Sequence, residues 1–529
     1  MASESFAYNN ADQEAWRPSV NPWLIAVSVI MPTFMEVLDT TIANVALNHI
    51  AGSMSASYSQ ATWVLTSYLI SNAVVLPLTA WLGNRFQRKR FLLFCIFLFT
   101  VSSLFCGLSV NLPMLLVMRI IQGIGGGALA PISQAILMES FPPRKQGIAQ
   151  ALFGLGVVVA PVVGPVLGGW LTDSYSWRWI FYINIPFGLL AMWAIQQTVE
   201  DPPWVRHSKP GPLDTFGLVA LSLWLGCQEI FLDKGQEDDW FGSQFIRIMA
   251  VLAVSGFVVF VWRELRVEKP MVDLRLFAIR NFSIATVLIF LTCVLIYSIG
   301  LLTPQFLQLL LGYSSLASGI ATAPLGLGAV ISMVLVGILV RKIDGRLIAI
   351  FGFLVLAAAS FRLSQINLSI NAWTVFWPQI LAGSAMGFLF VPVNILGTAP
   401  LRRDQIGSAT GALSLMRNVG GSVGIAWVST LLARRSQMHQ TMLGQDLTPN
   451  NLLLLQDLHG IRRFLSMECA SFGNGAPQAL AAVYRILQQQ AALMAFTDVF
   501  QDLVLVALGA ILLVALLHGA APRPGAPLH

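Results

Sequence analysis

The segment Ala80-Trp-Leu-Gly-Asn-Arg-Phe-Gln-Arg-Lys-Arg90 ends an apolar run of this chain. A second segment of the same kind, Gly337-Ile-Leu-Val-Arg-Lys-Ile-Asp-Gly-Arg346, ends another apolar run much further along. In both, small and apolar residues give way to a cluster of basic residues. A basic junction that recurs after an apolar run indicates two similar halves, each built from several such runs.

The composition indicates that these runs lie in a lipid bilayer. Of the 529 residues, 56% are hydrophobic and 11% are charged, where a soluble domain carries about 25% charged residues. A membrane-spanning helix takes about 20 residues. The 14 predicted spans make this an all-α integral membrane protein and exclude a soluble enzyme, a nucleic-acid-binding protein and a secreted disulfide scaffold. They are expected at 23–47, 60–82, 91–110, 112–137, 147–171, 178–198, 213–233, 244–264, 282–311, 316–341, 346–367, 372–397, 408–433 and 498–518.

The placement of Lys and Arg predicts the orientation. If the N-terminus is cytoplasmic, 20 of the 31 basic residues lie in inner segments, and three (Arg178, Lys234 and Arg247) lie in the short outer loops. Basic residues concentrate on the cytoplasmic side of membrane proteins. We therefore expect both termini in the cytoplasm. The cysteines form no paired framework and the six His do not cluster, so we expect no metal site and no cofactor.

Glycines extend the repeat into the spans. Gly123 and Gly127 recur 260 residues later as Gly383 and Gly387. Because the matched spans cross in the same direction, the halves are parallel repeats of six helices, as in two-halved transporters. The expected order is a cytoplasmic tail at 1–22, a six-helix bundle at 23–198, an extra helix pair at 213–264, a second bundle at 282–518 that includes an outer loop at 434–497, and a tail at 519–529.

The first span carries two carboxylates, in the sequence Glu36-Val-Leu-Asp39. A charge in a span costs at least about 2.5 kcal/mol, so intramembrane acids are usually functional. Three residues apart on a helix, the two acids share a face and can point into one cavity. We expect Asp39 to be the main proton carrier and Glu36 to assist it. The alternative is that one of them orients a neighbouring helix without titrating.

A basic residue at the same depth offers Asp39 a partner. Asp39 lies eight residues from the outer end of its span and Arg119 seven, or about 12 and 10 Å at 1.5 Å per residue. A buried Arg needs a partner, so an Asp39–Arg119 pair is expected. The arginine would keep Asp39 ionised, and protonation would need the pair to open, as an antiporter requires. A static structural ion pair is the alternative.

Other polar side chains within spans are candidates for a substrate cavity. Arg417 lies nine residues from the inner end of its span, about 14 Å deep, where its side chain cannot easily reach water. It would face the cavity and either pair with an acid or attract an anionic substrate group. The expected cavity residues are Asn44, Gln122, Asn394, Arg417 and Asn418.

The fifth span contains closely spaced glycines and a proline, in the string Gly164-Pro165-Val-Leu-Gly168-Gly169. Small residues four apart allow helices to pack closely. Such a thin helix suits a rocking bundle, and packing alone explains it nearly as well. The string Gly123-Ile-Gly-Gly-Gly127 likewise indicates a packing face, because no strand precedes it as a dinucleotide fingerprint requires.

Taken together, these strings resemble the 14-helix drug:proton antiporters of the major facilitator superfamily, of the EmrB/QacA type, from about residue 23 to 518. The resemblance implies the major facilitator fold, with two six-helix bundles and two extra helices. It also implies coupling roles for Asp39 and Arg119. The antiporter motif would be Gly164, Pro165, Gly168 and Gly169, and the cytoplasmic gating loop would be Asn84, Arg85, Arg88 and Arg90. Asn84 replaces the usual Asp of that loop, which weakens the case for a charge-based inner lock.

The resemblance also implies partners. The loop 434–497 holds apolar stretches at 452–455 and 479–494, and amphipathic helices outside the membrane need something to cover them. In the EmrB-like branch this place serves a periplasmic adaptor (membrane fusion) protein that leads to an outer-membrane channel. The alternative is a loop that folds back on its own bundle.

The function expected from these features is proton-coupled efflux of lipophilic drugs or toxic small molecules across the bacterial inner membrane. A proton-linked importer or facilitator on the same fold is the alternative, because fold does not fix direction. An ATP-driven pump would need a GxxxxGK[ST] loop and a metalloprotease an HExxH site, and the sequence contains neither. We therefore expect a transporter and not an enzyme, with lipid around it and no nucleic acid as partner.

Overall fold

The computed structural model describes residues 18–142, 145–202, 214–267, 273–340, 342–401, 406–445 and 476–517. All regular elements in these ranges are helices. The first series comprises α2 (Pro22–Ser53), α3 (Tyr58–Val75), η1 (Leu76–Leu78), α4 (Thr79–Phe86), α5 (Arg88–Gly107), α6 (Leu112–Gly126), α7 (Leu129–Ser140), α8 (Gln146–Ser174), α9 (Trp179–Tyr182) and α10 (Asn184–Thr198).

Two peripheral helices and a second series follow. The helix pair comprises α12 (Thr215–Lys234) and α13 (Gln244–Arg266), with the short η3 (Trp240–Gly242) and η4 (Leu274–Ala278) beside them. The second series comprises α14 (Arg280–Leu309), α15 (Ser315–Thr322), α16 (Pro324–Leu339), α17 (Gly345–Leu363), α18 (Ala372–Thr398), α19 (Ile406–Gln445) and α21 (Ala476–Ala515).

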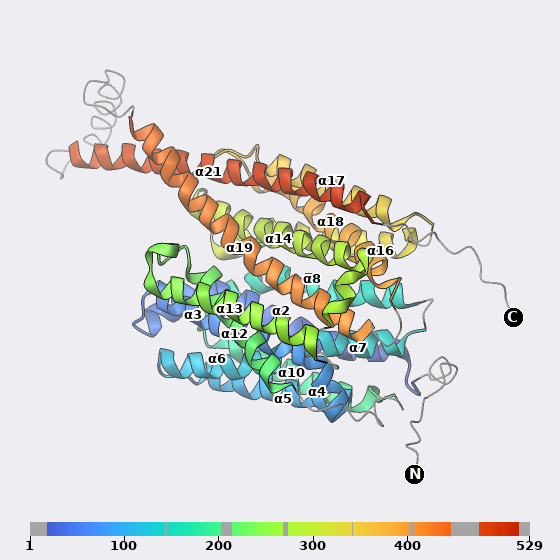
Figure 1. Cartoon of the computed structure of the whole chain (residues 1–529). Coiled ribbons are helices and arrows are strands. Elements are labelled where there is room, and N and C mark those ends of the chain that lie inside the picture. The colour runs from blue at the N-terminus through green and yellow to red at the C-terminus, as the bar shows by residue number, and fades with distance from the viewer. Residues whose placement is uncertain are drawn as a thin grey trace, which may run out of the picture.

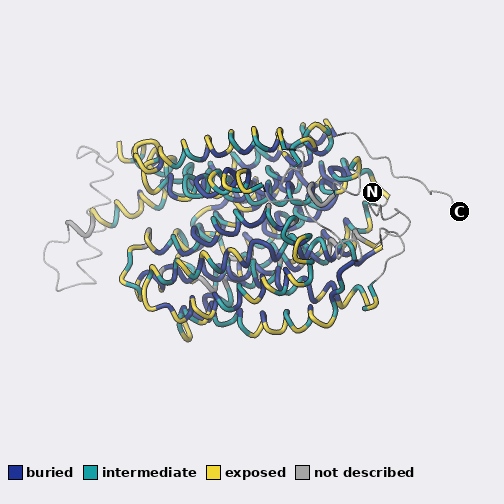
Figure 2. The backbone as a smooth tube through the Cα atoms, turned by 60° about the horizontal axis from the view of Figure 1, so that its bottom comes forward, coloured by how far each residue is buried: buried dark blue, intermediate teal, exposed yellow. Residues whose placement is uncertain are grey.

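Eleven helical segments of the described chain are long and apolar enough to cross a membrane. The predicted spans at 60–82, 147–171 and 408–433 are helical as well, in α3 to α4, α8 and α19, but lie outside this set of eleven. The outward faces suit lipid, since large apolar side chains such as Trp193, Val251 and Leu512 are 64%, 67% and 72% exposed. Figure 2 shows the buried residues along the inner faces of the helices.

The helix pairings of the first series recur in the second. Helix α2 packs against α8 and α10, and α14 packs against α19 and α21. Likewise α6 packs against α3 and α5, and α18 against α16 and α17. The local signals repeat too, because Asn111 caps α6 through the Met114 N–H and Asn371, 260 residues later, caps α18.

The repeated glycines lie where these paired helices touch. A side chain at Gly123 or Gly127 would meet α3, at the backbone of Tyr68 or Asn72. A side chain at Gly383 or Gly387 would meet α16 in the same way. The glycine pairs therefore allow equivalent close contacts in the two series, as small residues do in membrane helices.

The two series meet along a long interface (Figure 1). From the first series, α8 contacts α15, α16 and α18 of the second. From the second series, α19 contacts η1, α4 and α7 of the first. Helix α12 packs against both α3 and α19, so the peripheral pair touches both series.

Helices α19 and α21 are each 40 residues long. At 1.5 Å per residue each measures about 60 Å, twice the roughly 30 Å hydrocarbon core of a bilayer. Figure 1 shows them extending together past the ends of the other helices. Polar contacts join the two helices, with His439 Nε2 2.8 Å from Asp498 Oδ2 and an ion pair of 2.5 Å between Arg435 Nη2 and Asp502 Oδ2. The predicted loop 434–497 is therefore helical at both of its ends.

Several predicted features lie outside the described residues. They are residues 1–17, the loop segment 446–475 with its apolar stretch at 452–455, residues 518–529, and the basic residues Arg17, Arg144, Arg206, Lys209, Lys269, Arg341, Arg402, Arg403 and Arg523.

Candidate functional site

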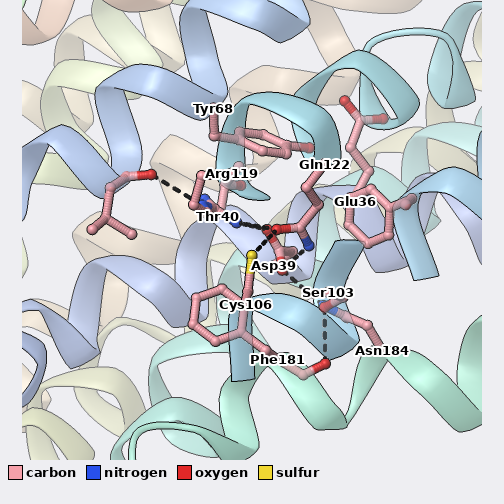
Figure 3. A network of polar contacts seen from close by, with 12 residues as sticks. Glu36, Asp39, Thr40, Tyr68, Ser103, Cys106, Arg119, Gln122, Phe181 and Asn184 are labelled. Carbon is pink, nitrogen blue, oxygen red and sulfur yellow. Dashed lines mark hydrogen bonds and ion pairs between the residues drawn. The ribbon is translucent and has the colours of Figure 1, made fainter. Parts of the chain in front are cut away.

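An ion pair lies inside the first helix series (Figure 3). Asp39 of α2 is 2% exposed and Arg119 of α6 is 0% exposed. Arg119 Nη1 donates a hydrogen bond of 2.6 Å to Asp39 Oδ2. The structure therefore contains the contact expected from the equal depths of these residues in their spans.

Amide side chains satisfy the second oxygen of Asp39. Gln122 Nε2 donates to Asp39 Oδ1 at 2.9 Å, and Asn184 Nδ2 of α10 donates to the same oxygen at 2.7 Å. Asn184 also donates to Ser103 Oγ at 3.0 Å, and Ser103 in turn donates to the Phe181 carbonyl at 2.9 Å. Three donor side chains thus converge on one buried carboxylate, and both of its oxygens accept hydrogen bonds.

The arginine is held from several sides. Its Nε donates to the Val64 carbonyl of α3 at 3.0 Å, and its Nη1 also donates to Gln122 Oε1 at 2.8 Å. The guanidinium carbon lies 4.4 Å from the centre of the Tyr68 ring and 5.6 Å from that of Phe181. These aromatic faces attract a cation. In the described part of the chain Nη2 has no hydrogen-bond partner, so one donor is left for a further acceptor.

Glu36 lies one turn from Asp39 on α2 but outside this network. Asn72 Nδ2 of α3 donates to Glu36 Oε1 at 2.9 Å. The other oxygen, Oε2, is buried and has no hydrogen-bond partner among the described residues. The two acids share α2, as their spacing predicts, and have separate hydrogen-bond partners. A joint role in proton coupling stays a prediction.

The residues expected in a substrate cavity fall into two groups. Gln122 belongs to the Asp39 network. Arg417 of α19 lies over Phe390, with its guanidinium carbon 5.4 Å from the ring centre, and Asn394 donates to the Phe390 carbonyl at 2.6 Å. The Nε of Arg417 is buried without a hydrogen-bond partner in the described chain. The structure therefore brings Arg417 and Asn394 to one aromatic residue.

The two other expected cavity residues lie elsewhere in these helices. Asn44 is exposed on α2, and Asn418 is half-buried on α19. Within the described residues, no hydrogen bond joins either side chain to the groups above, so their place in one cavity stays a prediction.

The predicted antiporter motif lies in α8, where this helix packs on α2. A side chain at Gly164 would meet Thr41, and one at Gly168 would meet Ile42, with atoms 3.2–3.3 Å away. Thr41 and Ile42 follow Asp39 by two and three residues. Gly169 is buried in the same helix, which runs unbroken through Pro165. Movement of α8 would therefore act directly on the segment that carries Asp39.

The predicted gating loop joins α4 and α5. Arg88, at the start of α5, forms an ion pair with Glu139 at the end of α7. Asn84 and Arg85 lie at the end of α4, and Arg85 and Arg90 are exposed. Although Asn84 replaces the usual acid, the loop keeps a charged contact through Arg88, which ties α5 to α7.

The position equivalent to Arg119 in the second series carries a neutral amide. Gln379 lies 260 residues after Arg119 and is 1% exposed on α18. Its Oε1 and Nε2 have no hydrogen-bond partner among the described residues. The two series thus share their helix packing, but the buried ion pair belongs to the first.

The sequence did not single out Asn184, Ser103 or Tyr68. Each is a neutral side chain in an apolar run, and neutral polar residues inside spans are common enough to carry little signal. Their role depends on which helices meet, since Asn184 and Ser103 reach Asp39 from α10 and α5. The signal that was present, a polar side chain in a span, could not distinguish them from helix-packing residues.

The sequence matches a known protein family and several known exporters. Residues 30–425 match the family model described as Major Facilitator Superfamily. The multidrug export protein EmrB of Haemophilus influenzae is 37% identical over 445 residues, 83% of this chain and 86% of that protein. The fatty acid resistance protein FarB of Neisseria gonorrhoeae is 35% identical over 478 residues, 90% of this chain and 92% of that protein.

A solved structure extends the similarity to the fold. A bacterial homologue of the human lysosomal transporter Spinster, in an inward-facing and unoccupied conformation, superposes with a TM-score of 0.55. It is 16% identical in sequence, and the match covers 96% of this chain and 99% of that chain. At this identity the likeness concerns the arrangement of helices.

Proposed function

The chain belongs to the Major Facilitator Superfamily, and we propose that it exports lipophilic drugs, fatty acids or similar toxic molecules from a bacterial cell in exchange for protons. The relatives named for multidrug export and fatty acid resistance support the substrate class. The observation that supports proton coupling is the buried Asp39–Arg119 pair, in which Gln122 and Asn184 also donate hydrogen bonds to Asp39.

The coupling follows from the contacts of Asp39. While Arg119, Gln122 and Asn184 all donate to it, the carboxylate holds its charge and has little affinity for a proton. If α2 moves relative to α6 and α10, these donors withdraw and the buried carboxylate takes up a proton. When they return, the proton is released. Helix α8, packed on Thr41 and Ile42, is the element that would transmit the movement of the bundles.

The substrate site is expected on the other series. Arg417 presents a buried Nε without a partner in the described chain and lies over Phe390. A guanidinium beside an aromatic face can bind a carboxylate while the ring contacts an apolar chain. We infer that Arg417 binds the anionic group of weakly acidic substrates, and that neutral drugs use the apolar surroundings.

We also propose that the chain crosses the membrane 14 times, with both termini in the cytoplasm. Besides the eleven segments that meet the length and hydropathy criteria, α3 to α4, α8 and α19 pack within the bundle and would complete 14 spans. The excess of basic residues in alternate loops supports cytoplasmic termini and a location in the bacterial inner membrane. Residues 23–198 and 282–518 would then be the two bundles, and 213–264 the extra pair.

The extended ends of α19 and α21 support a tripartite pump. They carry exposed apolar side chains on the part that would project from the membrane: Met438, Met442, Leu480, Tyr484 and Ile486. Apolar side chains outside lipid are unfavourable unless a partner covers them. We propose that a periplasmic adaptor, connected to an outer-membrane channel, binds there. Photo-crosslinkers at Leu480 and Tyr484 should capture it, whereas one at Trp193 on the lipid face should not.

Transport in vesicles tests this function. Inverted membrane vesicles that contain the protein should take up a lipophilic drug or a fatty acid when their interior is acidified, and an uncoupler should abolish that uptake. Uptake that survives the uncoupler would contradict proton coupling. Movement in the opposite direction under the same gradient would identify an importer.

A further inference from the structure

Helix α12 carries two carboxylates on one face, a feature that the function above does not use. Glu229 and Asp233 are four residues apart, in the sequence Glu229-Ile-Phe-Leu-Asp233, and so share a face of the helix. Acids within an apolar span are costly and usually functional. The same signal singled out the acids of the first span.

These carboxylates join the extra helix to both series. Ser422 Oγ of α19 donates a hydrogen bond of 3.1 Å to Glu229 Oε1. Thr66 Oγ1 of α3 donates a hydrogen bond to Asp233 Oδ2. Thr66 lies two residues from Val64, whose carbonyl accepts from Arg119, so α3 contacts both acidic sites.

The surroundings of Glu229 differ from those of Asp39. Among the described residues Glu229 forms no ion pair, and the charged side chain that acts on it is Asp233. Ser422 of α19 faces Glu229, and Thr66 of α3 faces Asp233. Among the described residues, no titratable group of α13 acts on either acid. Lys234 and Glu237 lie beside Asp233 at the end of the helix. A half-buried carboxyl without a cation can accept a proton without first breaking an ion pair.

We propose that Glu229 is a second proton-binding residue of the transport cycle, reached from the outer side past the exposed Asp233. This rests on the proposed proton-coupled export. A proton from the outer medium would form an O–H bond with the Glu229 carboxylate, and no other covalent bond would change.

Protonation at this position would change the contact between α12 and α19. When Glu229 is ionised, the hydrogen bond from Ser422 is charge-assisted, and such bonds are about twice as strong as neutral ones. A neutral Glu229 therefore holds α19 less firmly. Since α19 also carries Arg417, proton binding on the extra helix would loosen the helix that holds the proposed substrate-binding residue.

The test compares Glu229→Gln with two controls in proteoliposomes, where proton flux and substrate flux are recorded together. Glutamine keeps an oxygen that accepts from Ser422 but cannot bind a proton at neutral pH. We expect Glu229→Gln to lower the number of protons moved per substrate and to flatten the pH profile, with substrate affinity retained. Asp238→Asn, an exposed change in the adjoining loop, should behave as wild type. A wild-type proton ratio and pH profile in Glu229→Gln would overturn the proposal.

A second variant covers the case in which Glu229→Gln does not accumulate in the membrane. Ser422→Ala keeps the carboxyl and removes the donor that favours its charged form, so the pH midpoint of transport should rise by about one unit. An unchanged midpoint would contradict a proton at Glu229.

Asp39→Asn separates the two proposals. If wild type moves no protons, the export mechanism fails; if Asp39→Asn stops proton flux and Glu229→Gln leaves it unchanged, the second site alone fails.

Discussion

Arg119 Nη1 lies 2.6 Å from Asp39 Oδ2, and the two residues are 0% and 2% exposed. Removing one member of such a pair leaves an uncompensated charge away from water, which typically costs about 3–5 kcal/mol. The pair therefore links stability and function, and variants that remove one charge or both separate the two effects.

We expect Arg119→Leu to destabilise the protein by about 3–5 kcal/mol, because Asp39 loses its counter-ion. The double variant Asp39→Asn with Arg119→Leu should recover part of that loss, since no buried charge remains. Unfolding in detergent, followed by circular dichroism for the wild type, both single variants and the double variant, measures this coupling. Strictly additive losses would show that the two side chains do not interact energetically.

The amide donors should set the pH at which transport occurs. Asn184→Leu removes a hydrogen bond of 2.7 Å to Asp39 Oδ1, so the carboxylate should bind a proton more readily and the midpoint of the pH profile should move upward. Gln379→Leu is the matched control, because this buried amide has no partner in the described chain. The account is wrong if both variants shift the profile equally or if neither does.

Close packing of α8 on α2 should be essential for movement. Gly164→Val places a branched side chain against Thr41, two residues from Asp39, and should reduce the transport rate per folded molecule as well as the amount of folded protein. Gly411→Ala is the control, since a side chain there has no described atom within 4 Å. Transport per folded molecule is the relevant measure. Wild-type rates for Gly164→Val would exclude a role for this contact.

The start of α12 depends on a capping carboxylate. Asp214 accepts hydrogen bonds from the Gly217 N–H at 3.1 Å and from Arg263 Nε at 2.9 Å. The hydrogen bond from Arg263 lowers the pKa of Asp214 below its ordinary value. Its stabilising effect is therefore complete above the unfolded-state pKa, near 4, and is lost as the pH falls through the lowered folded-state value.

Asp214→Ala should accordingly lower the free energy of unfolding by about 1 kcal/mol at pH 7, the usual effect of losing a helix cap. The difference from wild type should shrink on acidification below about pH 4. Denaturant unfolding at a series of pH values measures it. A difference that grows toward low pH would contradict the assigned sign.

The sequence predicts the membrane class, the repeat and the depth of the charged residues because these depend on hydropathy and on the spacing of residues along the chain. Hydropathy gives the runs, and the 260-residue spacing of Gly123 and Gly383 predicts equivalent contacts, which the structure contains. The pair of Asp39 and Arg119 follows from equal depth and opposite charge. Each of these inferences needs the position of a residue within one span and no knowledge of its neighbours.

What the sequence does not reveal depends on which helices meet. Asn184 reaches Asp39 from α10, and Ser422 reaches Glu229 from α19, and both contacts need three-dimensional proximity between distant segments. The extension of α19 to Gln445 is also hard to predict, because its outer part is polar and resembles a loop by hydropathy. Charged contacts such as Arg435 with Asp502 stabilise that part once α21 lies beside it.

Proton-driven transport by Asp39→Asn tests the central claim most directly. Asparagine keeps the size of the side chain and an oxygen that can accept from Arg119, but it cannot carry a proton. In inverted vesicles with a proton gradient, substrate uptake by the variant should fall to the level of empty vesicles, while substrate binding to the purified protein persists. Uptake against a gradient at near the wild-type rate would contradict the account, and the proton would then be carried by another acid such as Glu36 or Glu229.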